Sequence, residues 1–264
     1  MSSAFSDIVQ TEEDKEQQYI IGNVMNEMPC DQSASLIHLD DAWARPKRND
    51  EYSEDSVMGV NYPTHPFDGN GLSVTSVIDL CWETLEEGGW LIMDVDDWLL
   101  PRVTNYLINE YGDVNGGDKP YRGGGYRKTG RVVYVTKSDG TVNRAGGAKY
   151  LRQSGYPVVF AHKGETDRYG YSSVVQLCHK PSDDHGWYSL KPIPPYKTWI
   201  DELTEEGDTI VEPCAGTAPA CIAARDLYGD NISFTAIDVE PDASKAFHRR
   251  MESFWFNGKD ISNK

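Results

Sequence analysis

The hydrophobic positions of the chain fall into short continuous runs that alternate with segments of helical spacing. Short apolar runs predict buried strands, here at residues 19–23, 35–39, 90–95, 131–136, 157–162, 209–211 and 233–237. Apolar residues spaced three or four apart predict helices at 72–85, 101–111, 196–203, 220–228 and from about 242 onward. Gly88 and Gly89 are expected to end the first of these helices. Strands that alternate with helices predict an α/β fold with a mostly parallel sheet.

Several segments lack this periodicity. Residues 1–18 are polar and acidic, which predicts a disordered tail. Residues 44–70 hold turn formers and two prolines and are expected to form a long loop. Residues 112–130 are rich in glycine, so no regular element is expected there. The strands at 131–136 and 157–162 follow one another, which predicts an antiparallel pair and therefore one antiparallel strand in the sheet.

The charge of the chain is strongly negative. Its 264 residues include 42 acidic and 25 basic side chains, which give a formal net charge of −17. A solvated acidic surface suits a proteome adapted to high salt, so we expect a halophilic host or a virus of such a host. An ordinary acidic cytosolic protein is the alternative.

The basic residues are concentrated in one part of the chain. The segment 102–152 has ten basic and four acidic residues, so it carries +6 while the rest of the chain carries −23. A basic island in an acidic protein predicts contact with a polyanion. A solvated surface of mixed charge is the alternative.

Cysteine and histidine spacing argues against other classes of protein. The five cysteines include no CxxC pair and the six histidines show no HExxH spacing, so neither a disulfide scaffold nor a metal site is expected. No run of about 18 apolar residues is present, and the N-terminal residues lack an apolar signal-peptide core. We therefore expect a cytoplasmic protein without a membrane partner.

The first candidate site follows the strand at 35–39. This apolar run ends in Asp40 and Asp41, and Trp43 comes next. In open α/β sheets, ligands bind just past the carboxyl ends of the strands. An acid and an aromatic ring at that place could hold and stack a flat polar substrate such as a base. The alternative is a strand that ends in a solvated acidic turn.

The second candidate site lies between 209 and 229, where a strand, a turn of small residues and a helix follow one another. A helix N-terminus favours an anionic group, and Ala215 and Gly216 would let a ligand approach the backbone. Asp238 ends the next strand, where an acid can accept hydrogen bonds from both ribose hydroxyls. These features predict a ligand that contains a nucleoside. A tight turn without a ligand is the alternative.

These motifs, taken together, resemble the DNA amino-methyltransferases that use S-adenosylmethionine, in their circularly permuted (beta) arrangement. In that arrangement the catalytic motif precedes the cofactor motif. In chain order the matching segments are Ile20-Ile21-Gly22-Asn23, Asp40-Asp41-Ala42-Trp43, Leu85-Glu86-Glu87-Gly88-Gly89, Lys163-Gly164, Lys191-Pro192 and the turn from Glu212 to Pro219. The resemblance runs from Tyr19 to the end of the chain. It implies a Rossmann-like methyltransferase fold in a single domain, 19–264, with a basic target-recognition insert around 112–156.

The match departs from the family pattern at three places. The family tetrapeptide is Asp, Asn or Ser, then Pro-Pro and an aromatic residue, whereas here Asp41 and Ala42 replace both prolines. Ala218 stands where the cofactor turn of the family has its second glycine. Asn23 replaces an aspartate of the opening turn.

The resemblance implies methyl transfer from S-adenosylmethionine to N6 of a flipped-out adenine in double-stranded DNA. Asp40 would accept a hydrogen bond from the amine, the carbonyl of Asp41 would take its second N–H, and Trp43 would stack on the base. The implied cofactor-binding residues are Asn23, Lys191, Glu212, Cys214, Ala215, Gly216, Thr217 and Asp238. The candidates for DNA contacts are Arg122, Arg127 and Lys128.

Other functions stay open. N4 of cytosine is an alternative target, because both groups are amines on flat rings. A weakened protein of the same fold that only binds cofactor or DNA is another, as is a methyltransferase acting on RNA or protein amines. A nicotinamide-dependent dehydrogenase would need a GxGxxG turn near the first strand, and the sequence has none there. A monomer or a homodimer is expected.

Overall fold

The computed structural model describes residues 16–40, 74–97, 99–113, 123–136, 139–142, 154–181, 185–187 and 190–257. Its strands are β1 (Gln17–Ile21), β2 (Ala34–Asp40), β3 (Leu85–Asp94), β4 (Gly125–Val135), β5 (Tyr156–His162), β6 (Val175–His179), β7 (Thr209–Pro213) and β8 (Ser233–Asp238). Its helices are α1 (Val24–Glu27), α2 (Val74–Thr84), α3 (Leu100–Tyr111), α4 (Pro194–Leu203), α5 (Pro219–Tyr228) and α6 (Pro241–Asn257), and a short 3-10 helix, Gly229–Asn231, follows α5.

The described strands form one eight-stranded sheet in the order β1-β8-β7-β2-β3-β5-β4-β6. In sheet order, the neighbouring strands β1, β8, β7, β2 and β3 all pair in parallel, and β6 pairs in parallel with β4. Strand β5 runs antiparallel to both of its neighbours, β3 and β4. The expected α/β sheet with one antiparallel strand is therefore confirmed, as is the antiparallel pairing of β4 with β5.

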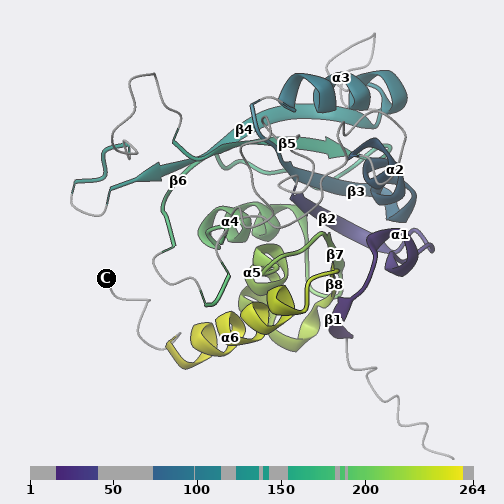
Figure 1. Cartoon of the computed structure of the whole chain (residues 1–264). Coiled ribbons are helices and arrows are strands. Elements are labelled where there is room, and N and C mark those ends of the chain that lie inside the picture. The colour runs from purple at the N-terminus through teal and green to yellow at the C-terminus, as the bar shows by residue number, and fades with distance from the viewer. Residues whose placement is uncertain are drawn as a thin grey trace, which may run out of the picture.

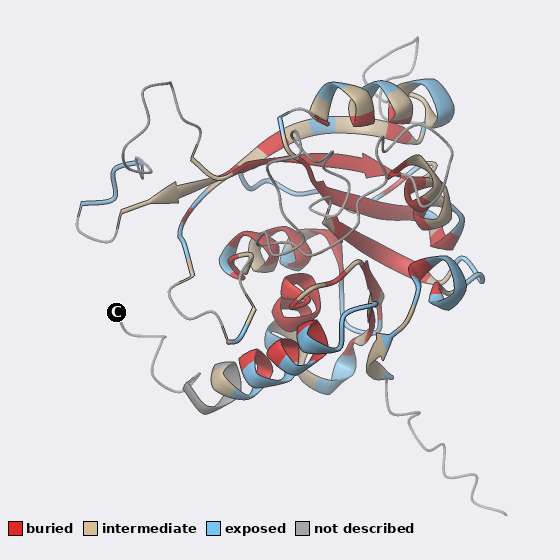
Figure 2. Ribbon diagram, in the orientation of Figure 1, coloured by how far each residue is buried: buried red, intermediate tan, exposed pale blue. Residues whose placement is uncertain are grey.

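Helices cover both faces of this sheet (Figure 1). Leu36 and Ile92 pack with residues of α4, α5 and α6 in one apolar cluster. Their neighbours Ile37 and Leu91 pack with residues of α1, α2 and α3 in a second cluster. Because both faces of the central strands are buried (Figure 2), these strands read as continuous apolar runs rather than as alternating patterns.

The expected helix end at Gly88 and Gly89 is wrong. Helix α2 ends at Thr84, and both glycines lie inside β3, where the pairing register with β2 shifts. Gly88 has φ +84°, and a Cβ on Gly89 would lie 2.9 Å from the carbonyl oxygen of Ala34. The two glycines therefore allow a bulge in a buried strand.

The expectation that 112–130 holds no regular element is also wrong, because β4 begins at Gly125. A Cβ on Gly125 would lie 2.0 Å from the carbonyl oxygen of Gly112, and one on Gly130 would lie 2.3 Å from that of Val174. These glycines let other backbone segments approach the strand closely. A glycine-rich sequence alone does not distinguish a strand that packs closely against other backbone from a loop.

Two further differences concern short strands at the sheet edges. Strand β1 begins at Gln17, so the last two residues of the expected tail pair with β8. Strand β6 was not predicted, because most of its five residues are exposed and form no apolar run. Residues 1–15 and the expected loop at 44–70 lie outside the described residues. None of the described helices is long and apolar enough to cross a membrane.

Candidate active site

The carboxyl ends of the parallel strands meet at one edge of the sheet, and acidic residues gather there. Asp40 ends β2 and pairs in register with Asp94, which ends β3. On the other side of β2, Glu212 lies in β7 and Asp238 ends β8. The structure thus brings together acids that the sequence places far apart along the chain.

Lys191, just before α4, forms ion pairs with both Asp40 and Asp94. Its Nζ lies 3.2 Å from Oδ1 of Asp40 and 3.2 Å from Oδ2 of Asp94. The same ammonium lies 3.9 Å from the centre of the Tyr156 ring, which is a favourable cation–π position. Two carboxylates on adjacent strands would repel each other, and the lysine between them offsets that repulsion.

His38 links this pair to the turn after β7. The imidazole is fully buried, with Nε2 3.3 Å from Oδ2 of Asp94 and Nδ1 2.6 Å from Oε1 of Glu212. Burial alone would lower the pKa of His38, but the two carboxylates raise it to about 10. The ring is therefore an imidazolium at neutral pH.

Asp94 is the centre of this network. Burial alone would raise its pKa, but Lys191 and His38 hold the pKa below the ordinary value, so the carboxylate stays ionised. Its Oδ2 also accepts a hydrogen bond from the Tyr196 hydroxyl, which lies 2.7 Å from that of Tyr156. We refer to Asp40, Lys191, Asp94, His38 and Glu212 as the charge network.

Glu212 connects the charge network to helix α5. Its carboxylate accepts hydrogen bonds from the backbone N–H groups of Ala220 and Cys221, 3.1 and 3.0 Å away, in the first turn of α5. A carboxylate at this place is stabilised by the helix dipole. The N–H groups that were expected to face a ligand are thus bound to a side chain of the protein itself.

The turn between β7 and α5 has an unusual backbone. Cys214, Gly216 and Ala218 all have positive φ, at 53°, 52° and 44°. Such angles are free for glycine and strained for alanine, so a glycine would suit the backbone conformation of Ala218 better than the alanine does. The N–H of Gly216 donates to Oδ2 of Asp238 (2.8 Å), and its carbonyl accepts from the Tyr19 hydroxyl (2.7 Å).

Arg250 of α6 connects this turn to the backbone of Lys191. Its guanidinium donates to Oγ1 of Thr217 (2.9 Å) and to the backbone carbonyl of Lys191. The side chain is nearly buried, and burial lowers its pKa to about 10, so it remains charged at neutral pH. Arg250 therefore fixes two predicted cofactor residues relative to each other.

The other predicted site residues fall into three groups. Asn23 caps α1, accepting from the N–H of Met25 at 3.0 Å, and follows the strand that pairs with β8. Arg127 and Lys128 lie near the start of β4, at the end of the sheet away from Asp40. The remaining predicted residues, Asp41, Trp43 and Arg122, lie outside the described residues.

Sequence reasoning missed His38, Asp94 and Arg250. A signal existed for Asp94, because it follows an apolar run in the same way that Asp40 does. A histidine inside a buried strand is a weaker signal, since it gives no indication of its partners. The helical spacing of α6 was a signal for Arg250, because this residue falls on the same face as Ala243 and Phe247, whereas its exposed neighbour Arg249 does not.

Solved structures share this fold. No family model matches the sequence, and no curated protein matches it. The M1.HpyAVI–SAM complex gives a TM-score of 0.59 at 11% identity, covering 88% of this chain and 98% of that chain. The PvuII DNA methyltransferase (cytosine-N4-specific) gives 0.60 at 12% identity, with 92% and 93% covered. TTHA0409 of Thermus thermophilus, complexed with S-adenosyl-L-methionine, gives 0.56 at 11% identity, with 90% and 93% covered.

The chain has the Rossmann-like fold of a methyltransferase. The likeness extends over about nine-tenths of the chain in each comparison. The expected fold class is therefore confirmed, and the charge network lies at the carboxyl edge of a methyltransferase-type sheet.

Proposed function

We propose that this protein transfers a methyl group from S-adenosylmethionine to N6 of an adenine flipped out of double-stranded DNA. The observation that carries the proposal is the position of Asp40. It ends β2 beside Asp94, at the edge where Asp238 and the small-residue turn 214–218 also lie. A reacting amine at Asp40 and a nucleoside cofactor at Asp238 would thus share one edge of the sheet.

The residues at this edge fit S-adenosylmethionine. Oδ2 of Asp238 accepts one backbone N–H from Gly216 and Oδ1 accepts one from Glu240. Each carboxylate oxygen has a further lone pair, which is available to a ribose hydroxyl. Solved proteins of the same fold include two complexes with this cofactor, M1.HpyAVI and TTHA0409.

The cofactor would supply a methyl group bonded to a positively charged sulfur. In this proposal Asp40 accepts a hydrogen bond from the exocyclic amine, which orients the nitrogen lone pair toward that methyl group. As the new C–N bond forms, the sulfur keeps the electron pair of the bond that breaks, and the amine proton leaves toward Asp40 or water. Burial raises the pKa of Cys214 and Cys221 well above the usual range, so neither thiol serves as a nucleophile.

Lys191 has a positioning role in this scheme. It was expected among the cofactor residues, but its ammonium lies between Asp40 and Asp94. The lysine holds the Asp40 carboxylate at the end of β2, where a carboxylate oxygen can accept a hydrogen bond from the amine.

Cytosine N4 is the second candidate target. The PvuII enzyme, whose name gives it as cytosine-N4-specific, has the same fold over 92% of this chain. The preference for adenine rests on the aspartate at the first position of the resembling tetrapeptide. The beta-type motif order, the roles of Asp41, Trp43 and Arg122, and the recognition insert at 112–156 stay predictions. So do the halophilic origin, the cytoplasmic location and the oligomeric state.

The test is a direct search for methylated bases. The purified protein is incubated with S-adenosylmethionine and unmethylated plasmid in molar KCl and in low salt, and the digested DNA is examined by mass spectrometry. Asp40→Ala is run beside the parent, and Asp97→Ala, an exposed acid near the same edge, is the matched control. N6-methyladenine from the parent and D97A, but not from D40A, is expected. N4-methylcytosine would instead select the second candidate.

No methylated base in either salt, with cofactor binding intact, would contradict the proposal. The protein would then be a cofactor- or DNA-binding member of the fold. Methylation of RNA but not of plasmid would contradict it in another way, by replacing the substrate.

A further inference from the structure

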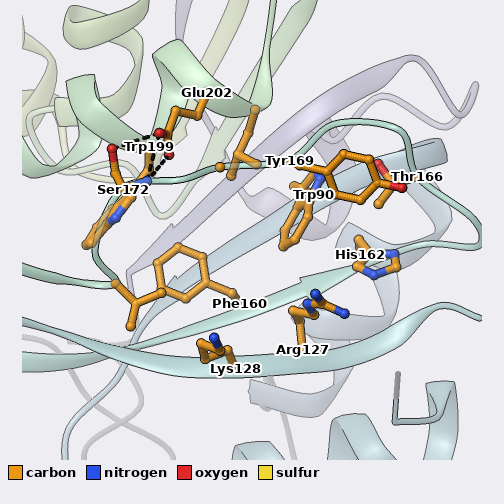
Figure 3. A pocket seen from close by; sticks show the side chains of 13 residues that line it. Trp90, Arg127, Lys128, Phe160, His162, Thr166, Tyr169, Ser172, Trp199 and Glu202 are labelled. Atoms are coloured by element: carbon orange, nitrogen blue, oxygen red, sulfur yellow. Dashed lines mark hydrogen bonds between the residues drawn. The ribbon is translucent and has the colours of Figure 1, made fainter. Parts of the chain in front are cut away.

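A pocket lies in the described part of the chain, toward the end of the sheet away from Asp40. It has a volume of about 150 Å³ and lies between β3, β4, β5, the 166–174 segment and α4 (Figure 3). Trp90 pairs in register with His162 there, four residues before Asp94 along β3. At about 3.3 Å per residue along the strand, Trp90 is roughly 13 Å from Asp94.

The walls of this pocket are aromatic. Trp90, Phe160 and Trp199 are each buried, and the last two rings meet edge to face with centroids 5.0 Å apart. Tyr169 is 56% exposed and lies at the same pocket. Aromatic side chains of this kind stack on flat rings. A cavity of about 150 Å³ has room for one six-membered ring.

Two consecutive cations line the pocket because of a bulge in β4. Regular alternation would send Arg127 and Lys128 to opposite faces of the sheet. The register shifts between Tyr126, which pairs with Ala161, and Lys128, which pairs with Phe160, so Arg127 is an extra residue. Bulges re-aim side chains, and both cations reach the pocket (Figure 3).

The acidic side chain at the pocket is held by the protein itself. The Glu202 carboxylate accepts hydrogen bonds from the backbone N–H groups of Tyr171 and Ser172 and from the Ser172 hydroxyl, at 2.7 to 3.2 Å. A Cβ on Gly170 would lie 2.3 Å from Oε2 of Glu202, so the glycine lets this segment close against α4. Glu202 thus builds the wall of the pocket.

Two further groups define what the pocket accepts. Nε1 of Trp90 is buried and has no hydrogen-bond partner among the residues that the structure describes, so a ligand acceptor that reached it would satisfy a buried donor. Burial, and to a lesser extent Arg127, lower the pKa of His162, whose Nδ1 lies 2.9 Å from the Gly164 carbonyl. His162 is therefore neutral at pH 7, and Arg127 and Lys128 supply the positive charge.

We propose that this pocket binds a pyrimidine nucleotide unit, with the ring between the aromatic walls and the phosphate at Arg127 and Lys128. The unit comes either from a free mononucleotide or from a nucleotide of single-stranded DNA, since both present the same ring and phosphate. The pocket is separate from the cofactor turn, so this binding does not depend on methyl transfer.

Tryptophan fluorescence offers a direct test, because Trp90 and Trp199 form the walls. The full chain is titrated at low salt with dTMP, with thymidine and with inorganic phosphate, and then with an oligothymidylate. We expect dTMP to bind about tenfold or more tightly than thymidine or phosphate, because only dTMP uses both the ring and the cations. An oligothymidylate that binds tighter than dTMP identifies DNA as the source, and one that binds no better identifies the free nucleotide.

The variants separate this pocket from other binding sites. Arg127→Gln and Lys128→Gln should each weaken dTMP binding by about tenfold. Arg131→Gln, on the same strand and paired with Asp97, and Lys245→Gln, paired with Asp242 on α6, remove the same charge elsewhere and should leave it unchanged. Asp238→Ala should also bind dTMP normally.

Three results would overturn the proposal. One is phosphate binding as tightly as dTMP, which would remove the role of the ring. Another is dTMP binding unchanged in R127Q and K128Q, which would remove the role of the cations. The third is loss of dTMP binding in D238A, which would place the ligand at the cofactor turn. Circular dichroism of each variant checks that the fold is intact.

Discussion

The two ends of the sheet use charge in opposite ways. At the carboxyl edge, His38 and Lys191 lie between acids, and Glu212 is bound to the start of α5. At the other end, Arg127 and Lys128 lie beside aromatic rings, and the local acid Glu202 is bound to the 170–172 segment. The first arrangement is internal and holds side chains in place, whereas the second places two cations at the wall of a pocket.

This contrast indicates which charged side chains stabilise the fold. A buried cation between two carboxylates cannot be removed without leaving uncompensated charge. An exposed cation at a pocket can be removed at little cost to the fold. Stability and binding should therefore respond to different substitutions at the two ends.

The largest expected effect is that of His38→Gln. The substitution removes the positive charge that lies between Asp94 and Glu212, so two buried carboxylates lose their shared partner. We expect a loss of about 3–5 kcal/mol in the free energy of unfolding. Urea denaturation followed by circular dichroism measures it. A loss below about 1 kcal/mol, equal to that of the exposed-pair control Lys197→Gln, would show that the charge network does not stabilise the fold.

The pH dependence of stability follows from the same residue. The pKa of His38 is about 10 in the folded chain, against 6.5 ordinarily. Because the folded value is the higher one, this contribution is fully present below pH 6.5 and is lost as the pH rises toward 10. Within that window the free energy of unfolding should fall by about 1.4 kcal/mol per pH unit.

The control for the pH experiment is the His38→Gln variant. It lacks the titrating group, so its stability should be flatter over the same window. Urea titrations at several pH values give both curves. Parallel curves for the parent and the variant would mean that His38 is not the group that titrates.

A smaller effect is expected from Arg250→Gln. Arg250 holds Thr217 and the backbone of Lys191, so its loss should loosen the cofactor turn rather than the reacting group. We expect the Kd for S-adenosylmethionine to rise about tenfold, as for the loss of one charged hydrogen bond, with little change in kcat. The matched control is the neighbouring Arg249→Gln, whose guanidinium contacts the His185 carbonyl. A fall in kcat without a change in Kd would assign Arg250 a different role.

The smallest effect on stability is expected at the pocket. Lys128→Gln should leave the free energy of unfolding within about 0.5 kcal/mol of the parent, because this side chain is exposed. The same urea titration measures it. A loss comparable to that of H38Q would remove the contrast between the two ends, because the pocket cation would then also be structural.

The sequence predicted the parts of the site that depend on local pattern. Asp40 and Asp238 each end an apolar run, so their places at strand ends could be read directly, as could the small-residue turn at 214–218. Parallel pairing then brings strand ends to one edge. The likeness to a family added the expected cofactor and target.

The sequence did not predict the partners within the charge network. His38 and Glu212 are 174 residues apart along the chain, and such contacts depend on the strand order and register rather than on local pattern. The pocket could not be predicted from the sequence for a similar reason. Arg127 and Lys128 were singled out for their charge, but only the bulge in β4 places both beside Trp90.

The most direct test of the account is a single-turnover measurement of methyl transfer. Excess protein, preloaded with labelled S-adenosylmethionine, is mixed with plasmid, and the label that reaches the adenine N6 is followed over time. We predict that D97A transfers at the parental rate. D40A should be slower by about 10²–10⁴ and should bind the cofactor with an unchanged Kd. Transfer by D40A at the parental rate would contradict the assignment of Asp40 as the residue that holds the amine.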